Sequence, residues 1–138
     1  ANPCLYGCVM AYLRFKKELK MVMDSMRDKF IILSFSFVLI GIGVLSLMPP
    51  ASGIELGEHD KWNHFIAYLI LALNWCFIKN KRNFFFLGLV LCACYGLSLE
   101  YFQGFVPGRV PSWLDALANT GGVVTGFLIY SIAKTKRG

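Results

Sequence analysis

The sequence predicts an all-α fold, specifically a polytopic membrane protein built as an antiparallel bundle of four transmembrane helices. The chain has 138 residues, of which 57% are hydrophobic and only 16% are charged. A soluble domain of this size carries more charged residues. The apolar residues also come in long blocks, and about 20 helical residues are enough to cross the hydrocarbon core of a bilayer. This length leaves room for one domain.

Four apolar blocks give the expected helices. In chain order they cover residues 30–48, 62–78, 84–102 and 113–133. Pro49 and Pro50 are expected to end the first helix, because proline lacks the N–H that a helix interior needs. Pro107 and Pro111 should likewise keep the third connection out of helix. Residues 79–83 are too few for anything but a tight turn between antiparallel neighbours.

The chain therefore divides into a membrane domain at 30–133, a basic N-terminal segment at 1–29 and a basic tail at 134–138. Ser112 is the expected N-cap of the fourth helix, because serine is favoured at that position. The apolar part of residues 1–20 is too short to span a bilayer. An interfacial helix, a cloning remnant and an upstream extension are all open interpretations of these twenty residues, and the oligomeric state is open as well.

The basic residues predict an orientation. There are six Lys or Arg in residues 1–29, three in 79–83 and three after 133, against one each in 49–61 and 103–112. Because positive residues stay on the cytoplasmic side, both termini should be cytoplasmic. Membrane flanks also account for the net charge of +6 without any nucleic acid. The expected partner is the lipid bilayer.

Polar residues gather where this topology brings three helix ends together at the outer surface. The candidate ligand-binding cluster is Asp60, Lys61, His64, Glu100, Gln103, Arg109, Asp115 and Asn119. Polar and charged groups inside a membrane are costly and usually functional. If Lys61 and Asp60 lie near the membrane–water interface, their charged groups are hydrated there and need no functional explanation. Glu100 and Asn119 fit that interpretation poorly, because apolar sequence surrounds Glu100 and Asn119 lies a turn deeper than Asp115.

Helical spacing places members of this cluster on shared faces. The three sets are Asp60, His64 and Tyr68; Gly96, Glu100 and Gln103; and Asp115, Asn119, Gly122 and Gly126. Residues three or four apart lie on one side of a helix. In the last set, Gly122 and Gly126 form a pair of small residues that lets a neighbouring backbone approach closely. The polar residues should therefore face another helix rather than lipid.

The available chemistry is that of a binding site or an acid–base site. Glu100 or Asp115 can act as a general base or hold a cation, and His64 can carry a proton. Arg109 can grip a phosphate or carboxylate with two parallel hydrogen bonds. A divalent metal between Asp60, His64 and the two carboxylates lacks any recognised ligand spacing. We therefore assign no metal and no cofactor, and the sequence leaves open whether the protein is an enzyme.

Several short motifs resemble the VanZ-like family of small bacterial membrane proteins. They are "VLSLMPP"; Asp60, Lys61, His64 and Phe65; Glu100 and Gln103; Pro107, Gly108 and Arg109; and Asp115, Asn119 and Gly122. The resemblance covers about residues 30–133 and leaves residues 1–25 outside. It implies a location in the bacterial cytoplasmic membrane with a site at its outer face. The founding member of that family is associated with low-level resistance to the glycopeptide teicoplanin.

Four functional hypotheses follow from the cluster and the resemblance. The first is a protein that binds an amphiphile at the outer leaflet, such as a lipid head group, a lipid-linked cell-wall precursor or a lipoglycopeptide. The second is a membrane-embedded enzyme acting on a lipid-linked envelope precursor, although no nucleophile motif is present. The third is a small proton- or cation-coupled transport subunit. The fourth is a purely structural clasp of hydrogen bonds that holds the bundle together.

Overall fold

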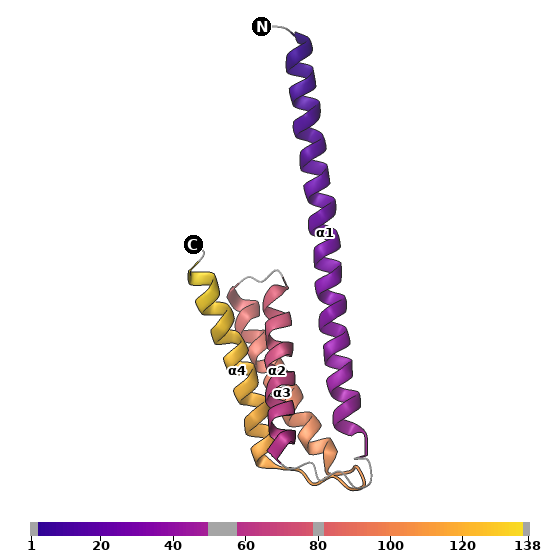
Figure 1. The fold of residues 1–138 in the computed structure, drawn as a ribbon, viewed down its shortest axis with the longest axis vertical. Helices are drawn as coiled ribbons and strands as arrows, with labels where there is room; N and C mark the ends of the chain where they lie inside the picture. Colours follow the sequence, from indigo (N-terminus) through magenta and orange to yellow (C-terminus); the bar gives the residue numbers. More distant parts are fainter. Residues whose placement is uncertain (1–2, 50–57, 79–81, 137–138) are drawn as a thin grey trace.

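The structure, a computed structural model, describes residues 3–49, 58–78 and 82–136, and in these ranges it consists of four α-helices without any strand (Figure 1). The helices are α1 (Pro3–Leu47), α2 (Glu58–Phe77), α3 (Arg82–Gln103) and α4 (Trp113–Thr135). The predicted all-α class is therefore confirmed. Side chains are described for residues 10–49, 61–78 and 84–136.

Three of the helices are long and apolar enough to cross a membrane, namely α3, α4 and the part of α1 from Met10 onward. α1 and α3 run in the same direction, and α2 returns between them along the bundle (Figure 1). If α1 and α3 cross the bilayer, α2 must cross it too, and its 20 residues give a helix about 30 Å long. Both chain termini consequently lie at the same end of the molecule.

The helix boundaries agree with the proline positions but differ elsewhere. α1 ends at Leu47, just before Pro49, with the N–H of Met48 still bonded to the carbonyl of Val44. α1 also begins far earlier than residue 30, so the change at residue 29 is one of composition and not of secondary structure. α3 begins at Arg82, so the helix takes up the last two residues of the turn predicted at 79–83. Residues 79–81 lie outside the described ranges.

The buried core lies where α2 meets the other three helices. Its apolar members are Ile42, Tyr68, Leu71, Ala72, Cys76, Cys92, Leu99, Val123 and Phe127. Four of these come from α2, and three of the four, Tyr68, Leu71 and Ala72, are at most 1% exposed. α2 is therefore the central element, and His64 near its beginning is buried as well.

Two glycines set the distance between α2 and α4. A Cβ atom at Gly122 would overlap the backbone carbonyl of Phe65, and one at Gly126 would come within 2.9 Å of both Ala72 Cβ and the Leu69 carbonyl oxygen. The two helix backbones are thus in direct contact, as the pair of small residues predicts. This contact fixes the height of Asn119 on α4 relative to His64 on α2.

α1 is attached to the bundle through its second half. The hydroxyl of Tyr95 on α3 donates to the carbonyl of Leu39 at 2.8 Å. The hydroxyl of Ser34 donates to Oδ1 of Asn74 on α2, also at 2.8 Å. Hydrogen bonds of this kind stabilise helix association in a membrane, where no water competes for them. The first half of α1 extends beyond the other helices (Figure 1).

Candidate functional site

His64 and Asn119 join α2 to α4 inside the bundle. His64 Nδ1 lies 3.1 Å from Asn119 Oδ1, and the two residues are 8% and 2% exposed. An amide oxygen only accepts hydrogen bonds, so the Nδ1 of His64 carries the proton and donates it. In neutral His64 the other ring nitrogen, Nε2, is then an acceptor. Asn119 thereby fixes both the orientation and the tautomer of the imidazole.

Glu100 joins the end of α3 to the beginning of α4. Its Oε1 accepts a hydrogen bond from the backbone N–H of Ser112. Ser112 is the N-cap of α4, as the sequence predicts, but its hydroxyl makes no capping hydrogen bond. Its carbonyl instead accepts from the N–H groups of Asp115 and Ala116. The carboxylate of Glu100, which is only 7% exposed, holds the N-cap residue in place.

Gln103 connects α3 to α1 one turn further along. Its Nε2 donates to the backbone carbonyl of Ser46 at 3.1 Å, and both residues are buried. The carbonyl groups in the last turn of a helix have no partner within that helix. Gln103 thus satisfies one of these groups at the end of α1, in a place that water does not reach.

Arg109 satisfies two more of the carbonyls at the end of α1. Its Nε donates to the Met48 carbonyl and its Nη2 to the Leu45 carbonyl, both at 3.1 Å. A cation at a helix C-terminus also interacts favourably with the helix dipole. Arginine has five N–H donors, so part of the guanidinium has no partner among the residues that the structure describes. Both of these hydrogen bonds are to backbone oxygens.

A turn in the loop before Arg109 sets the position of its side chain. The N–H of Arg109 bonds to the carbonyl of Val106, which closes a β-turn with Pro107 and Gly108 in the middle. Gly108 has a φ of 80°, a conformation that is strained for other residues. Proline followed by a glycine with positive φ defines a type II turn. The Pro-Gly-Arg motif is therefore a turn that aims arginine at α1.

A cleft of about 500 Å³ opens between α1 and α2 beside Arg109. Its lining has a polar part and an apolar part. The polar residues are Ser46, Asn63, His64, Tyr68 and Arg109, and the apolar ones are Ile42, Leu45, Ile66, Ala67 and Ile70. Leu45, Ile66 and Ile70 are 68%, 50% and 42% exposed. The cleft is thus open along an apolar side of the bundle, while the polar lining residues Ser46, His64 and Tyr68 are buried.

Tyr68 carries a polar group that the rest of the site does not use. Its side chain is 1% exposed, and its hydroxyl has no hydrogen-bond partner among the described residues. On the other side, its ring packs against Gly96 of α3, where an added Cβ would lie 3.0 Å from the ring and 3.1 Å from Asn119 Cβ. A buried hydroxyl without a partner costs stability and calls for an explanation.

Asp115 and Lys61 are not among the residues that line the cleft. Asp115 is buried in the first turn of α4, where a carboxylate is favoured by the helix dipole. Lys61 is exposed, and the side chain of Asp60 lies outside the described set. Over the described side chains, no group of three or more His, Cys, Asp or Glu could hold a metal ion.

The predicted cluster therefore separates into two sets. His64 and Arg109 line the cleft, whereas Glu100, Gln103 and Asn119 make hydrogen bonds that connect the helices. The cleft also contains Ser46 and Asn63, which the sequence-based cluster omits, and Tyr68, which it identified only as a member of the His64 face. Ser46 gave no signal because it lies within a long apolar block, and its position against α2 depends on tertiary packing.

These features define a small polytopic membrane protein of four helices with a polar site at the end opposite its termini. The chain belongs to the VanZ/LLP1 family, whose sequence profile matches residues 4–134. The predicted family resemblance is thus confirmed, and it also includes most of the N-terminal segment that the motifs alone left outside. No curated protein and no protein of known structure gives a match to the chain.

Proposed function

We propose that the α1–α2 cleft binds the polar head group of an amphiphile. The observation that carries this proposal is the buried Tyr68 hydroxyl, which lines the cleft and has no hydrogen-bond partner among the described residues. Arg109 lines the same cleft, and only two of its five N–H donors bond to the described part of α1. A phosphate or carboxylate head group needs donors of this kind.

The apolar part of the cleft supports an amphiphile rather than a water-soluble anion. Leu45, Ile66 and Ile70 line the cleft and are also exposed on the surface of the bundle. In a bilayer this surface would contact lipid, so an acyl or prenyl chain could lie along it while the head group reaches Tyr68. Binding sites that combine an apolar wall with a few placed polar groups are typical for small molecules.

The charge distribution supports a site at the outer leaflet. The cleft is lined by His64, near the beginning of α2, and by Arg109, in the connection from α3 to α4. The beginning of α2 and the α3–α4 connection lie at the end of the bundle away from the termini (Figure 1). The basic residues are concentrated in residues 1–29, in 79–83 and in the C-terminal tail. We therefore place the termini in the cytoplasm of a bacterial cell and the cleft at the outer face of its cytoplasmic membrane. A lipid-linked cell-wall precursor or a lipoglycopeptide such as teicoplanin has the required chemistry there.

Binding without catalysis is the preferred form of this proposal. Two of the groups considered for acid–base chemistry are already engaged within the protein: Glu100 by the N–H of Ser112 and His64 by Asn119. A proton or cation path is less favoured, because the fully buried Leu71 and Ala72 lie on α2 between Tyr68 and Asn74. Asn74 is the next polar residue on α2, and it bonds to Ser34 of α1. An apolar block of this kind interrupts proton transfer.

The test compares two tyrosine variants of the purified protein. Tyr68→Phe removes only the cleft hydroxyl, so the melting temperature should stay the same or rise, while the stabilisation by added polyprenyl phosphate should fall at least several-fold. Tyr95→Phe is the matched control: it removes a hydroxyl bonded to the Leu39 carbonyl, and should lower stability without reducing ligand stabilisation. Teicoplanin serves as the second probe. Equal ligand responses in both variants would contradict the proposed site.

A further inference from the structure

The first half of α1 is the part of the molecule without packing against the bundle (Figure 1). Between Met10 and Lys29 its side chains are exposed, apart from half-buried Asp24 and Asp28. Large apolar side chains are among them: Tyr12, Phe15 and Met26 are 63%, 65% and 66% exposed. An isolated helix is marginally stable in water, and exposed apolar surface of this extent indicates an interaction site.

The exposed apolar residues follow one line along the whole of α1. We call it the outer stripe, and its members are Tyr12, Phe15, Leu19, Val22, Met26, Phe30, Leu33, Phe37, Ile40 and Val44. Every step is three or four residues, which keeps the stripe on one face of a helix. The residues buried against the bundle, Ile42 and Ser46, lie on the opposite face. The outer stripe therefore points away from the bundle along its full length.

The spacing of the stripe in the first half of α1 is that of a coiled coil. From Tyr12 to Met26 the steps alternate three, four, three and four, which is the a and d pattern of a heptad repeat. Two successive steps of four, through Met26 to Phe30, then move Lys29 off the stripe. With Tyr12 at position a, charged residues occupy the outward positions b, c and f. They are Arg14, Lys17, Lys20, Asp24, Arg27 and Asp28.

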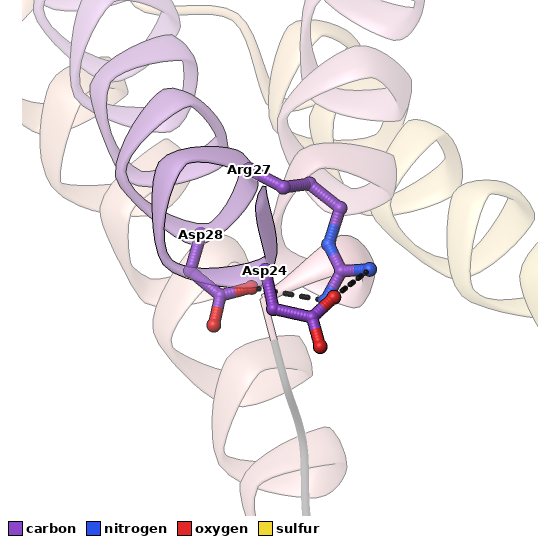
Figure 2. A network of polar contacts seen from close by, with 3 residues as sticks. All are labelled: Asp24, Arg27 and Asp28. Carbon is purple, nitrogen blue, oxygen red and sulfur yellow. Dashed lines mark hydrogen bonds and ion pairs between the residues drawn. The ribbon is translucent and has the colours of Figure 1, made fainter. Parts of the chain in front are cut away.

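Some charged side chains on the outward face of α1 form ion pairs with one another. Figure 2 shows Arg27 between two carboxylates of the same helix, with Nη1 3.0 Å from Asp24 Oδ1 and Nη2 3.3 Å from Asp28 Oδ1. In a parallel pairing, each g residue faces the e residue five positions later. These contacts would be Ala11 with Lys16 and Glu18 with Met23, so no like charges meet beside the stripe.

We propose that a second copy of this chain covers the outer stripe, in a parallel, in-register α1–α1 pair. Two copies inserted in one membrane with the same orientation present the same stripe at the same height, so a two-fold pairing requires no rearrangement. The stripe extends from residue 12 to residue 44, so a width of about 10 Å gives about 500 Å² on each copy. The total of about 1,000 Å² is close to the minimum area expected of a biological interface.

A bilayer surface is the competing occupant of the stripe. To lie in the plane of the membrane, residues 10–29 would have to bend away from the membrane-spanning half. α1 is instead one uninterrupted helix from Pro3 to Leu47, and it has no proline after its first residue. Sharp bends in helices usually need a proline, a glycine or a bulge. A partner that stands along the helix therefore fits α1 better than a surface across its axis.

Cross-linking in membranes tests the pairing. In full-length protein with its native cysteines replaced, Phe15→Cys or Leu19→Cys should form disulfide-linked dimers on mild oxidation. Lys17→Cys, on the opposite face of the same helix, should do so at least ten-fold more slowly. Equal rates at all three positions would overturn the proposal, because random collision does not distinguish the faces of a helix.

The mass of the purified protein in detergent gives the second measurement. Wild type should be a dimer, and Leu19→Lys combined with Val22→Lys should be a monomer with an unchanged circular dichroism spectrum. Asp24→Lys, on the outward face, should remain a dimer. Two results together would overturn the proposal and assign the stripe to the bilayer. The wild type would be a monomer, and a fluorescent label attached to the Leu19→Cys variant would be quenched by lipids with brominated chains.

Discussion

The carboxylate of Glu100 accepts a hydrogen bond from the backbone N–H of Ser112. This contact joins residues on either side of the loop between α3 and α4, and it satisfies the N–H of the residue at the N-cap position of α4. The acidic residue near the end of the apolar helix α3 therefore has a structural partner. Its contribution can be separated from that of the cleft by measuring stability and ligand response on the same variants.

Glu100→Gln should cost little stability and Glu100→Ala considerably more. Glutamine retains an oxygen that accepts from Ser112, so the expected loss is about 1 kcal/mol, the difference between a charged and a neutral hydrogen bond. Alanine leaves the N–H unpaired, for a loss of roughly 1–3 kcal/mol, plus the effect of a cavity. Thermal unfolding in detergent measures both. If glutamine is as harmful as alanine, the charge itself is required.

Arg109→Lys should loosen the end of α1. A lysine ammonium keeps the charge but cannot reproduce the fork that binds the carbonyls of Leu45 and Met48. Hydrogen exchange of the amides in the last turn of α1 should become faster, while those in the middle of α4 should not change. Arg14→Lys, at an exposed position on the same helix, is the control and should leave exchange in this turn as in wild type.

Gly122→Ala should destabilise the bundle, whereas Gly121→Ala should not. An added methyl at Gly122 would overlap the carbonyl of Phe65, but at Gly121 the nearest atoms are 3.7 Å away in the ring of Phe65. Overfilling a packed contact typically costs about 1–3 kcal/mol. The melting temperatures of the two neighbouring variants provide the comparison. Equal values would mean that α2 and α4 can separate at no cost.

Labelling of single cysteines should establish the orientation. In a background without native cysteines, Val110→Cys should react with a membrane-impermeant thiol reagent in intact cells, because Val110 is 83% exposed in the loop between α3 and α4. Lys136→Cys should react only after the cells are opened. The reverse result would move the cleft to the cytoplasmic face and exclude an outer-leaflet ligand.

The sequence by itself determined the helical class, the family and the helices of the membrane domain, but not the beginning of α1. Long apolar blocks and prolines leave few alternatives to membrane helices, because a backbone in lipid must satisfy its own hydrogen bonds. The glycine pair on α4 predicted a close contact with a neighbouring helix, since only a missing side chain permits such an approach, and the structure shows that this neighbour is α2. The heptad spacing of the first half of α1 is also visible in the sequence, although the apolar length there is too short to predict a membrane span.

Only the tertiary structure decided which polar residues form a site. Spacing places Glu100 and Gln103 on one face, but it does not reveal that their partners are the backbone of Ser112 and Ser46. Spacing put Tyr68 on the same face as His64. That its hydroxyl is buried without a partner among the described residues depends on how the helices pack around it. Backbone groups are present at every residue, so no sequence pattern marks the ones that a distant side chain will bind. Their positions are set by how the helices pack.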